Sequence, residues 1–112
     1  MPAPRLPALC LMVLAPAYAV AAADLASQRY LCDRDAQVWA SYVNTDAGSF
    51  AVVAFEGRQV AFEVAPSASG ARYQSADGAW TWWTKGDEAM LTHGAGNDEV
   101  TVYRSCRAAP AP

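Results

Sequence analysis

Short runs of β-branched and aromatic residues, separated by turn signals, dominate the chain after its first two dozen residues. No stretch of about a dozen residues shows the apolar spacing of an amphipathic helix. Strands are favoured over residues 29–32, 37–43, 50–55, 59–65, 71–75, 80–84, 88–92 and 99–104. Turns such as Asp77-Gly78 suit hairpins between them. The pattern predicts an all-β domain of about eight antiparallel strands, and both a small barrel and a sandwich fit it.

The first 23 residues have the features of an export signal. Arg5 supplies one positive charge, and residues 6–23 then run without a charge to a series of small residues before Asp24. Cleavage before Asp24 or before Val20 fits the small residues on either side. A membrane anchor is the alternative interpretation, but two prolines interrupt the apolar run. We therefore expect a cleaved signal peptide over 1–23, a periplasmic or secreted protein and no stable membrane anchor.

Cys10 does not fit a lipid attachment site, because it follows Leu9 rather than a small residue. We expect it to be removed with the leader. Without the leader, 89 of the 112 residues remain, which is one small domain and excludes large multi-domain enzymes and repeat arrays. These 89 residues carry seven basic and eleven acidic side chains, a net charge of −4. Such a balance disfavours nucleic acid and anionic lipid as partners and favours a cationic one.

Two cysteines remain in the mature chain, Cys32 near its start and Cys106 near its end. Outside the reducing cytosol, such a pair is expected to form a disulfide. The two positions are 74 apart, a separation for which the chain-entropy model gives a stabilisation of roughly 4 to 5 kcal/mol. Their spacing does not suit a closed metal shell, so no metal is predicted. We expect the barrel-like domain over 24–106 and a flexible tail over 107–112.

Few residues of the mature chain suit catalysis. Its single histidine, His93, adjoins Gly94 at a predicted turn, with Asp98 and Glu99 downstream. A solvated turn residue is the simpler interpretation of this histidine than a general base oriented by a carboxylate. Adjacent carboxylates on a strand point to opposite faces and cannot share one substrate. The sequence therefore predicts no catalytic residue, no cofactor and no enzyme.

The stretch from Ser67 to Leu91 carries the most specific signals. It combines Ser67-Ala-Ser-Gly-Ala-Arg-Tyr73 with Trp83-Thr-Lys-Gly-Asp-Glu-Ala89. Taken singly, these features are typical of a polar loop, a hairpin tip and core tryptophans. In a strand, Trp80 and Trp82 share one face and Trp83 takes the other.

Together with Tyr30-x-Cys32 and a closing Cys106, these motifs resemble the bacterial inhibitors of C-type lysozyme, in their membrane-bound and periplasmic forms. The likeness covers nearly all of the mature chain. It implies an eight-stranded antiparallel barrel tied by the terminal disulfide. It also implies that Ser69 and Lys85 enter the active-site cleft of a C-type lysozyme, the expected partner.

The resemblance implies further contacts and one departure from the family. Tyr73 and Thr84 are expected to line the same edge as Ser69 and Lys85, with Arg72 at the rim. Ser69 and Lys85 are sixteen positions apart, whereas the family pattern implies fourteen. The two extra residues fit the hairpin over 76–79. The oligomeric state is not predicted.

Two other functions fit the sequence less well. A secreted module that binds carbohydrate or peptidoglycan would use Trp80 or Trp82 as an exposed stacking surface. A structural envelope protein would use the two motifs only to build its barrel.

Overall fold

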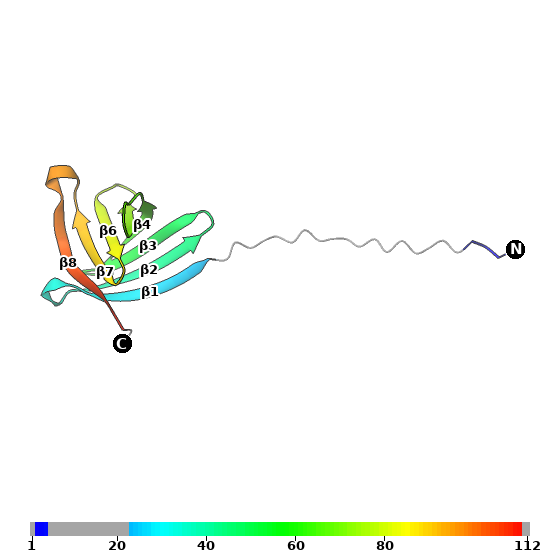
Figure 1. Cartoon of the computed structure of the whole chain (residues 1–112), viewed down its shortest axis with the longest axis horizontal. Coiled ribbons are helices and arrows are strands. Elements are labelled where there is room, and N and C mark those ends of the chain that lie inside the picture. The colour runs from blue at the N-terminus through cyan, green and yellow to red at the C-terminus, as the bar shows by residue number, and fades with distance from the viewer. Residues whose placement is uncertain (1, 5–22, 111–112) are drawn as a thin grey trace.

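The structure is a computed structural model that describes residues 2–4 and 23–110. Eight strands form one closed antiparallel barrel in which each strand pairs with its neighbours in sequence and β1 pairs with β8 (Figure 1). The strands are β1 (Asp24–Leu31), β2 (Gln37–Thr45), β3 (Gly48–Phe55), β4 (Arg58–Ala65), β5 (Ala71–Ser75), β6 (Trp80–Lys85), β7 (Glu88–His93) and β8 (Val100–Ala109). Two 3₁₀ turns, η1 (Asp33–Asp35) and η2 (Gly96–Asp98), complete the fold.

The predicted all-β class and the eight strands are confirmed, and the barrel is the closure that the fold adopts. The predicted leader over 1–23 lies outside the described residues except for 2–4 and 23. Within the part of the chain that is described, no helix is long and apolar enough to cross a membrane.

Alternation along the strands separates a buried interior from an exposed surface. In β3, Ala51, Val53 and Phe55 are buried, and the residues between them are partly exposed. This period of two is what a strand requires when one face packs on the core and the other faces solvent. The barrel interior is therefore the core.

Trp82 lies at the centre of this interior and is fully buried. Its indole N–H donates to the Tyr42 hydroxyl at 2.9 Å, and the Tyr30 and Tyr42 hydroxyls are 2.7 Å apart. The Tyr30 ring meets Trp82 edge to face, with ring centroids 5.1 Å apart. Burial raises the pKa of Tyr42 well above its ordinary value. The polar atoms of these three side chains thus satisfy one another inside an apolar core.

The two tryptophans suggested as a carbohydrate-stacking surface both pack against other side chains of the barrel. The prediction is wrong for Trp82, which is 0% exposed. Trp80 is partly buried against Phe55 and His93, whose ring centroids lie 5.0 and 4.5 Å away. The Arg58 guanidinium also lies over the Trp80 ring, at 5.7 Å. Both side chains therefore belong to the packing of the barrel.

The disulfide and the last strand close the barrel. Cys32 and Cys106 are bonded, as predicted. Beyond Cys106, residues 107–109 pair with residues 31–29 of β1, so the predicted flexible tail is wrong for these three residues. Gln28 adds a side-chain hydrogen bond to the Ala109 carbonyl at 2.9 Å. Backbone hydrogen bonds to the edge of β1 hold this segment, although two of its three side chains are only alanine.

Tyr103 makes the barrel sensitive to alkali. Its buried hydroxyl donates to the Glu56 carboxylate, and burial together with this carboxylate raises the pKa of Tyr103 to about 12. In the unfolded chain a tyrosine loses its proton at pH ~10, before Tyr103 does in the folded barrel. Deprotonation therefore stabilises the unfolded state first as the pH rises. We expect the free energy of unfolding to fall between pH ~10 and ~12.

Urea unfolding at pH 9, 10, 11 and 11.5 measures this slope. The Tyr103→Phe variant is less stable at pH 9, because it lacks the hydrogen bond, but its stability falls less steeply with pH. A variant slope equal to that of the wild type would assign the effect to other groups, such as Tyr30 and Tyr42, whose pKa values are also raised by burial.

Candidate functional site

Ser69 and Lys85 lie at the same end of two neighbouring strands. Ser69 belongs to the loop of residues 66–70 that precedes β5, and Lys85 is the last residue of β6. The ladder between these two strands ends at the Ala71–Thr84 pair, and Ser69 and Lys85 both lie just beyond that pair. The turn over 76–79 lies at the opposite end of both strands, so extra residues there do not separate Ser69 from Lys85.

Gly70 packs directly against the end of β6. Its φ angle is +67°, a backbone conformation that favours glycine. A β-carbon at this position would lie 2.3 Å from the Thr84 carbonyl oxygen and 3.2 Å from the Lys85 Cβ. No side chain fits there, so glycine allows the loop that carries Ser69 to pack directly against the end of β6.

Two hydrogen bonds converge on the Ser69 carbonyl oxygen. The Trp83 indole N–H donates to it at 3.0 Å, and the Ser67 hydroxyl donates to it at 2.5 Å. A carbonyl oxygen has two lone pairs, and both are used here. The loop of residues 66–70 is exposed along its whole length, yet its central peptide is held at two points.

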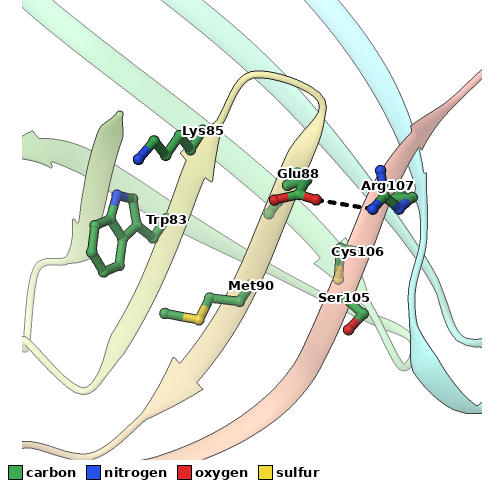
Figure 2. Close-up of a pocket in the computed structure, with 8 residues that line it drawn as sticks. Trp83, Lys85, Glu88, Met90, Ser105, Cys106 and Arg107 are labelled. Carbon is green, nitrogen blue, oxygen red and sulfur yellow. Dashed lines mark ion pairs between the residues drawn. The ribbon is translucent and has the colours of Figure 1, made fainter. Parts of the chain in front are cut away.

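Lys85 is exposed and projects from the outer face of the barrel (Figure 2). Its cross-strand neighbour Glu88 pairs with Arg107, 3.0 Å away, across the groove between β7 and β8. Among the residues that the structure describes, Lys85 has no ion-pair partner. Its ammonium group is therefore available to an external carboxylate.

The other predicted site residues lie in different environments. Arg72 is partly exposed and sits opposite Trp83 in the β5–β6 ladder, next to the Ser69 loop. Thr84 is partly buried, and its hydroxyl donates to the Ala71 carbonyl at 3.5 Å. The expectation that Tyr73 lines the exposed edge is wrong, because Tyr73 is 7% exposed and packs inside the barrel near Tyr42. Alternation along β5 turns Arg72 outward and Tyr73 inward.

A groove beside Lys85 joins Trp83 and Glu88 of the second motif to three residues that the sequence analysis did not single out, Met90, Ser105 and Arg107. Trp83 and Met90 contribute its apolar side, and Glu88, Ser105 and Arg107 its polar side (Figure 2). The outward direction of Trp83 follows from strand alternation. The pairing of β7 with β8 that sets Glu88 opposite Arg107 has no local signal in the sequence.

A family model described as membrane-bound lysozyme-inhibitor of c-type lysozyme matches residues 30–100 of the chain. A membrane-bound lysozyme inhibitor of C-type lysozyme from Cupriavidus necator is 40% identical over 68 residues, which are 61% of this chain and 53% of that protein. The protein of the same name from Pseudomonas aeruginosa is 39% identical over 85 residues, 75% of this chain and 65% of that protein. The chain thus spans about half to two thirds of the length of these relatives.

Two solved structures share the fold. The periplasmic lysozyme inhibitor of C-type lysozyme from Salmonella typhimurium superimposes with a TM-score of 0.68 at 27% identity, over 78% of this chain and 100% of that one. MliC from Pseudomonas aeruginosa, crystallised in complex with hen egg white lysozyme, superimposes with a TM-score of 0.63 at 32% identity, over 80% of this chain and 86% of that one. The family match covers well over half of the chain, and its fold is that of the solved inhibitors. The chain therefore belongs to the family of membrane-bound lysozyme inhibitors of C-type lysozyme.

Proposed function

We propose that this protein inhibits C-type lysozymes by inserting Ser69 and Lys85 into the active-site cleft, and thereby protects bacterial peptidoglycan. The observation that carries the proposal is the close packing of Gly70 on the end of β6, next to Lys85, which has no ion-pair partner among the described residues. Family membership supports it, as does the complex that the Pseudomonas aeruginosa relative forms with hen egg white lysozyme.

The chemistry of the target explains why these two residue types suit the cleft. A C-type lysozyme cleaves with two carboxyl groups, one protonated as the general acid and one ionised. An ammonium group on a flexible stem can reach the ionised carboxylate in a narrow cleft. A serine hydroxyl can donate or accept, so it can bond to the second carboxyl group in either protonation state. Occupying both groups blocks the enzyme without any reaction of the inhibitor.

The surroundings of Lys85 favour such a contact. Because Glu88 is paired with Arg107, binding does not have to break an ion pair of Lys85 within the described residues. A charge pair that becomes buried and hydrogen-bonded contributes far more to an interface than an exposed pair at its rim. The net charge of −4 expected for the mature chain adds long-range attraction to a basic enzyme, and added salt weakens this attraction.

We place this activity in the periplasm or outside the cell. A predicted export signal over 1–23 supports this location, and so does a disulfide that oxidising compartments preserve. The proposal involves no cofactor and assigns no catalytic residue.

The direct test follows the turbidity of bacterial cells during lysis by hen egg white lysozyme, with and without the purified mature protein. We expect lysis to stop when inhibitor and enzyme are present at equal concentration. Calorimetric titration of lysozyme without cells must then show one-to-one binding. Slower lysis without binding to the enzyme, together with sedimentation of the protein on purified peptidoglycan, would instead establish a carbohydrate-binding module.

Gly70→Ala tests whether the close packing of the loop matters. The new methyl group meets the Thr84 carbonyl, so the loop must move and Ser69 must leave its place beside Lys85. We expect the inhibition constant to rise at least about tenfold, the size of one lost buried hydrogen-bond partner.

Gly78→Ala is the matched control for this variant. Gly78 has a similar φ angle of +72°, so alanine there costs similar backbone strain, but nothing lies within 4 Å of its added β-carbon. Both variants should lose stability in thermal unfolding, Gly70→Ala more because of its clash with the Thr84 carbonyl, while only Gly70→Ala loses inhibition. Equal inhibition by the two variants would mean that the position of the loop is unimportant.

A further inference from the structure

The loop that carries Ser69 is exposed on every residue from 66 to 70. Exposed loops of small residues are ordinarily mobile, and ordering them on binding reduces affinity. In this loop, however, the Ser69 carbonyl accepts hydrogen bonds from Trp83 and Ser67. The peptide group between Ser69 and Gly70 is therefore already fixed in the unbound protein.

Trp83 is placed to hold this peptide. It lies two residues before Lys85, so both side chains leave the same face of β6. Figure 2 shows the indole nitrogen on the side of the ring that faces Lys85. The same nitrogen lies 3.1 Å from where a Gly70 β-carbon would be, so the indole edge and Gly70 are in close contact. One side chain thus connects the strand that carries the lysine to the loop that carries the serine.

We propose that Trp83 is a positioning residue, whose indole N–H fixes the Ser69 carbonyl and so orders the Ser69 hydroxyl next to Lys85 before lysozyme binds. This inference rests on the proposed function. The N–H is already engaged within the chain, so its contribution is to prior order and not to a hydrogen bond with the enzyme. Ser67 supplies a second hydrogen bond to the same carbonyl, but from within the loop, so it does not connect the loop to β6.

Order of this kind changes affinity through the fraction of molecules that are ready to bind. The apparent dissociation constant equals the intrinsic one divided by the fraction of the protein in the binding conformation. Losing one hydrogen bond of ordinary strength changes such a fraction by about three- to tenfold. On this proposal the effect acts through Ser69, because the bond holds the peptide group next to the Ser69 side chain.

Trp83→Phe removes the N–H and keeps an aromatic ring against Met90 and the end of β6. In the protein without lysozyme, we expect NMR relaxation to show greater mobility of the Ser69 and Gly70 amides. We also expect the dissociation constant for hen egg white lysozyme to rise about three- to tenfold. Ser67→Ala should act in the same direction with a smaller effect. Trp39→Phe, at a tryptophan 41% exposed on β2, is the control and should change neither quantity.

A double-mutant cycle separates positioning from direct contact. In the Ser69→Ala background, Trp83→Phe should weaken binding less than twofold, because no hydroxyl remains to be placed. Full additivity of the two losses would overturn the inference and make Trp83 a direct contact of lysozyme. Unchanged mobility of the Ser69 and Gly70 amides in Trp83→Phe would also overturn it.

The outcomes distinguish this inference from the proposed function. If the wild-type protein does not bind lysozyme, the proposed function fails. The inference about Trp83 then fails with it, whatever the relaxation data show. If the wild type binds and Trp83→Phe binds equally well, the inference alone fails.

Discussion

Replacing Lys85 with alanine is expected to raise the inhibition constant for hen egg white lysozyme at least about thirtyfold. The proposed contact is a charge pair inside an enclosed cleft, and truncating one member of such a pair costs about 2 to 5 kcal/mol because the other charge is left buried alone. Lys85→Met keeps the apolar stem and removes the ammonium, so it should lose nearly as much. Steady-state inhibition of cell lysis measures both variants.

Two further variants calibrate this loss. Ser69→Ala should cost less, about 1 to 3 kcal/mol, because it leaves one unsatisfied hydrogen-bond partner and no unpaired charge. Arg104→Ala removes an exposed cation from a different groove, which Glu56 and Val100 also line, and should change inhibition by less than about threefold. Equal losses for Lys85→Ala and Arg104→Ala would show that general charge, and not insertion of Lys85, drives inhibition.

Removing the disulfide is expected to lower the free energy of unfolding by about 2 to 5 kcal/mol. The bond joins residues 74 positions apart and lies beside the short β1–β8 pairing, which involves only residues 29–31 and 107–109 among those described. The expected single domain is small, so its core leaves little stability in reserve. The melting temperature should therefore fall by at least about 10 °C.

Thermal unfolding of the oxidised protein, the protein reduced by dithiothreitol and the Cys32→Ser/Cys106→Ser variant measures this effect. The reduced wild type and the double variant should unfold at similar temperatures, and the reductant should not change the variant. A wild type that unfolds at the same temperature with and without reductant would show that the barrel pairing alone closes the fold.

Most of the fold could be predicted because the strands alternate clearly and their turns carry glycine. All eight strands occur where the residue pattern places them. The two outer ends were missed: β1 begins at Asp24 and β8 continues to Ala109. These ends have little buried apolar surface, and their strand conformation depends on backbone hydrogen bonds to distant partners. Local sequence does not encode such partners.

The candidate site was predictable in outline and not in detail. The family resemblance pointed to Ser69 and Lys85, and the structure brings their loop and strand together. The inward direction of Tyr73 could have been recognised from its place next to Arg72 in a strand. The hydrogen bond from Trp83 to Ser69 could not, because it depends on how residues 66–70 cross the end of β6.

The pairing of the first strand with the last has a consequence for how the chain acquires its shape during synthesis. As the polypeptide leaves the ribosome, residues 29–31 have no partner for their outer edge until residues 107–109 have also emerged. Folding that depends on such distant contacts is slow, because the entropy of closing the long loop is lost before the contacts form. Slow closure of this pairing suits a chain that crosses a membrane before it folds, as the export that we propose would require.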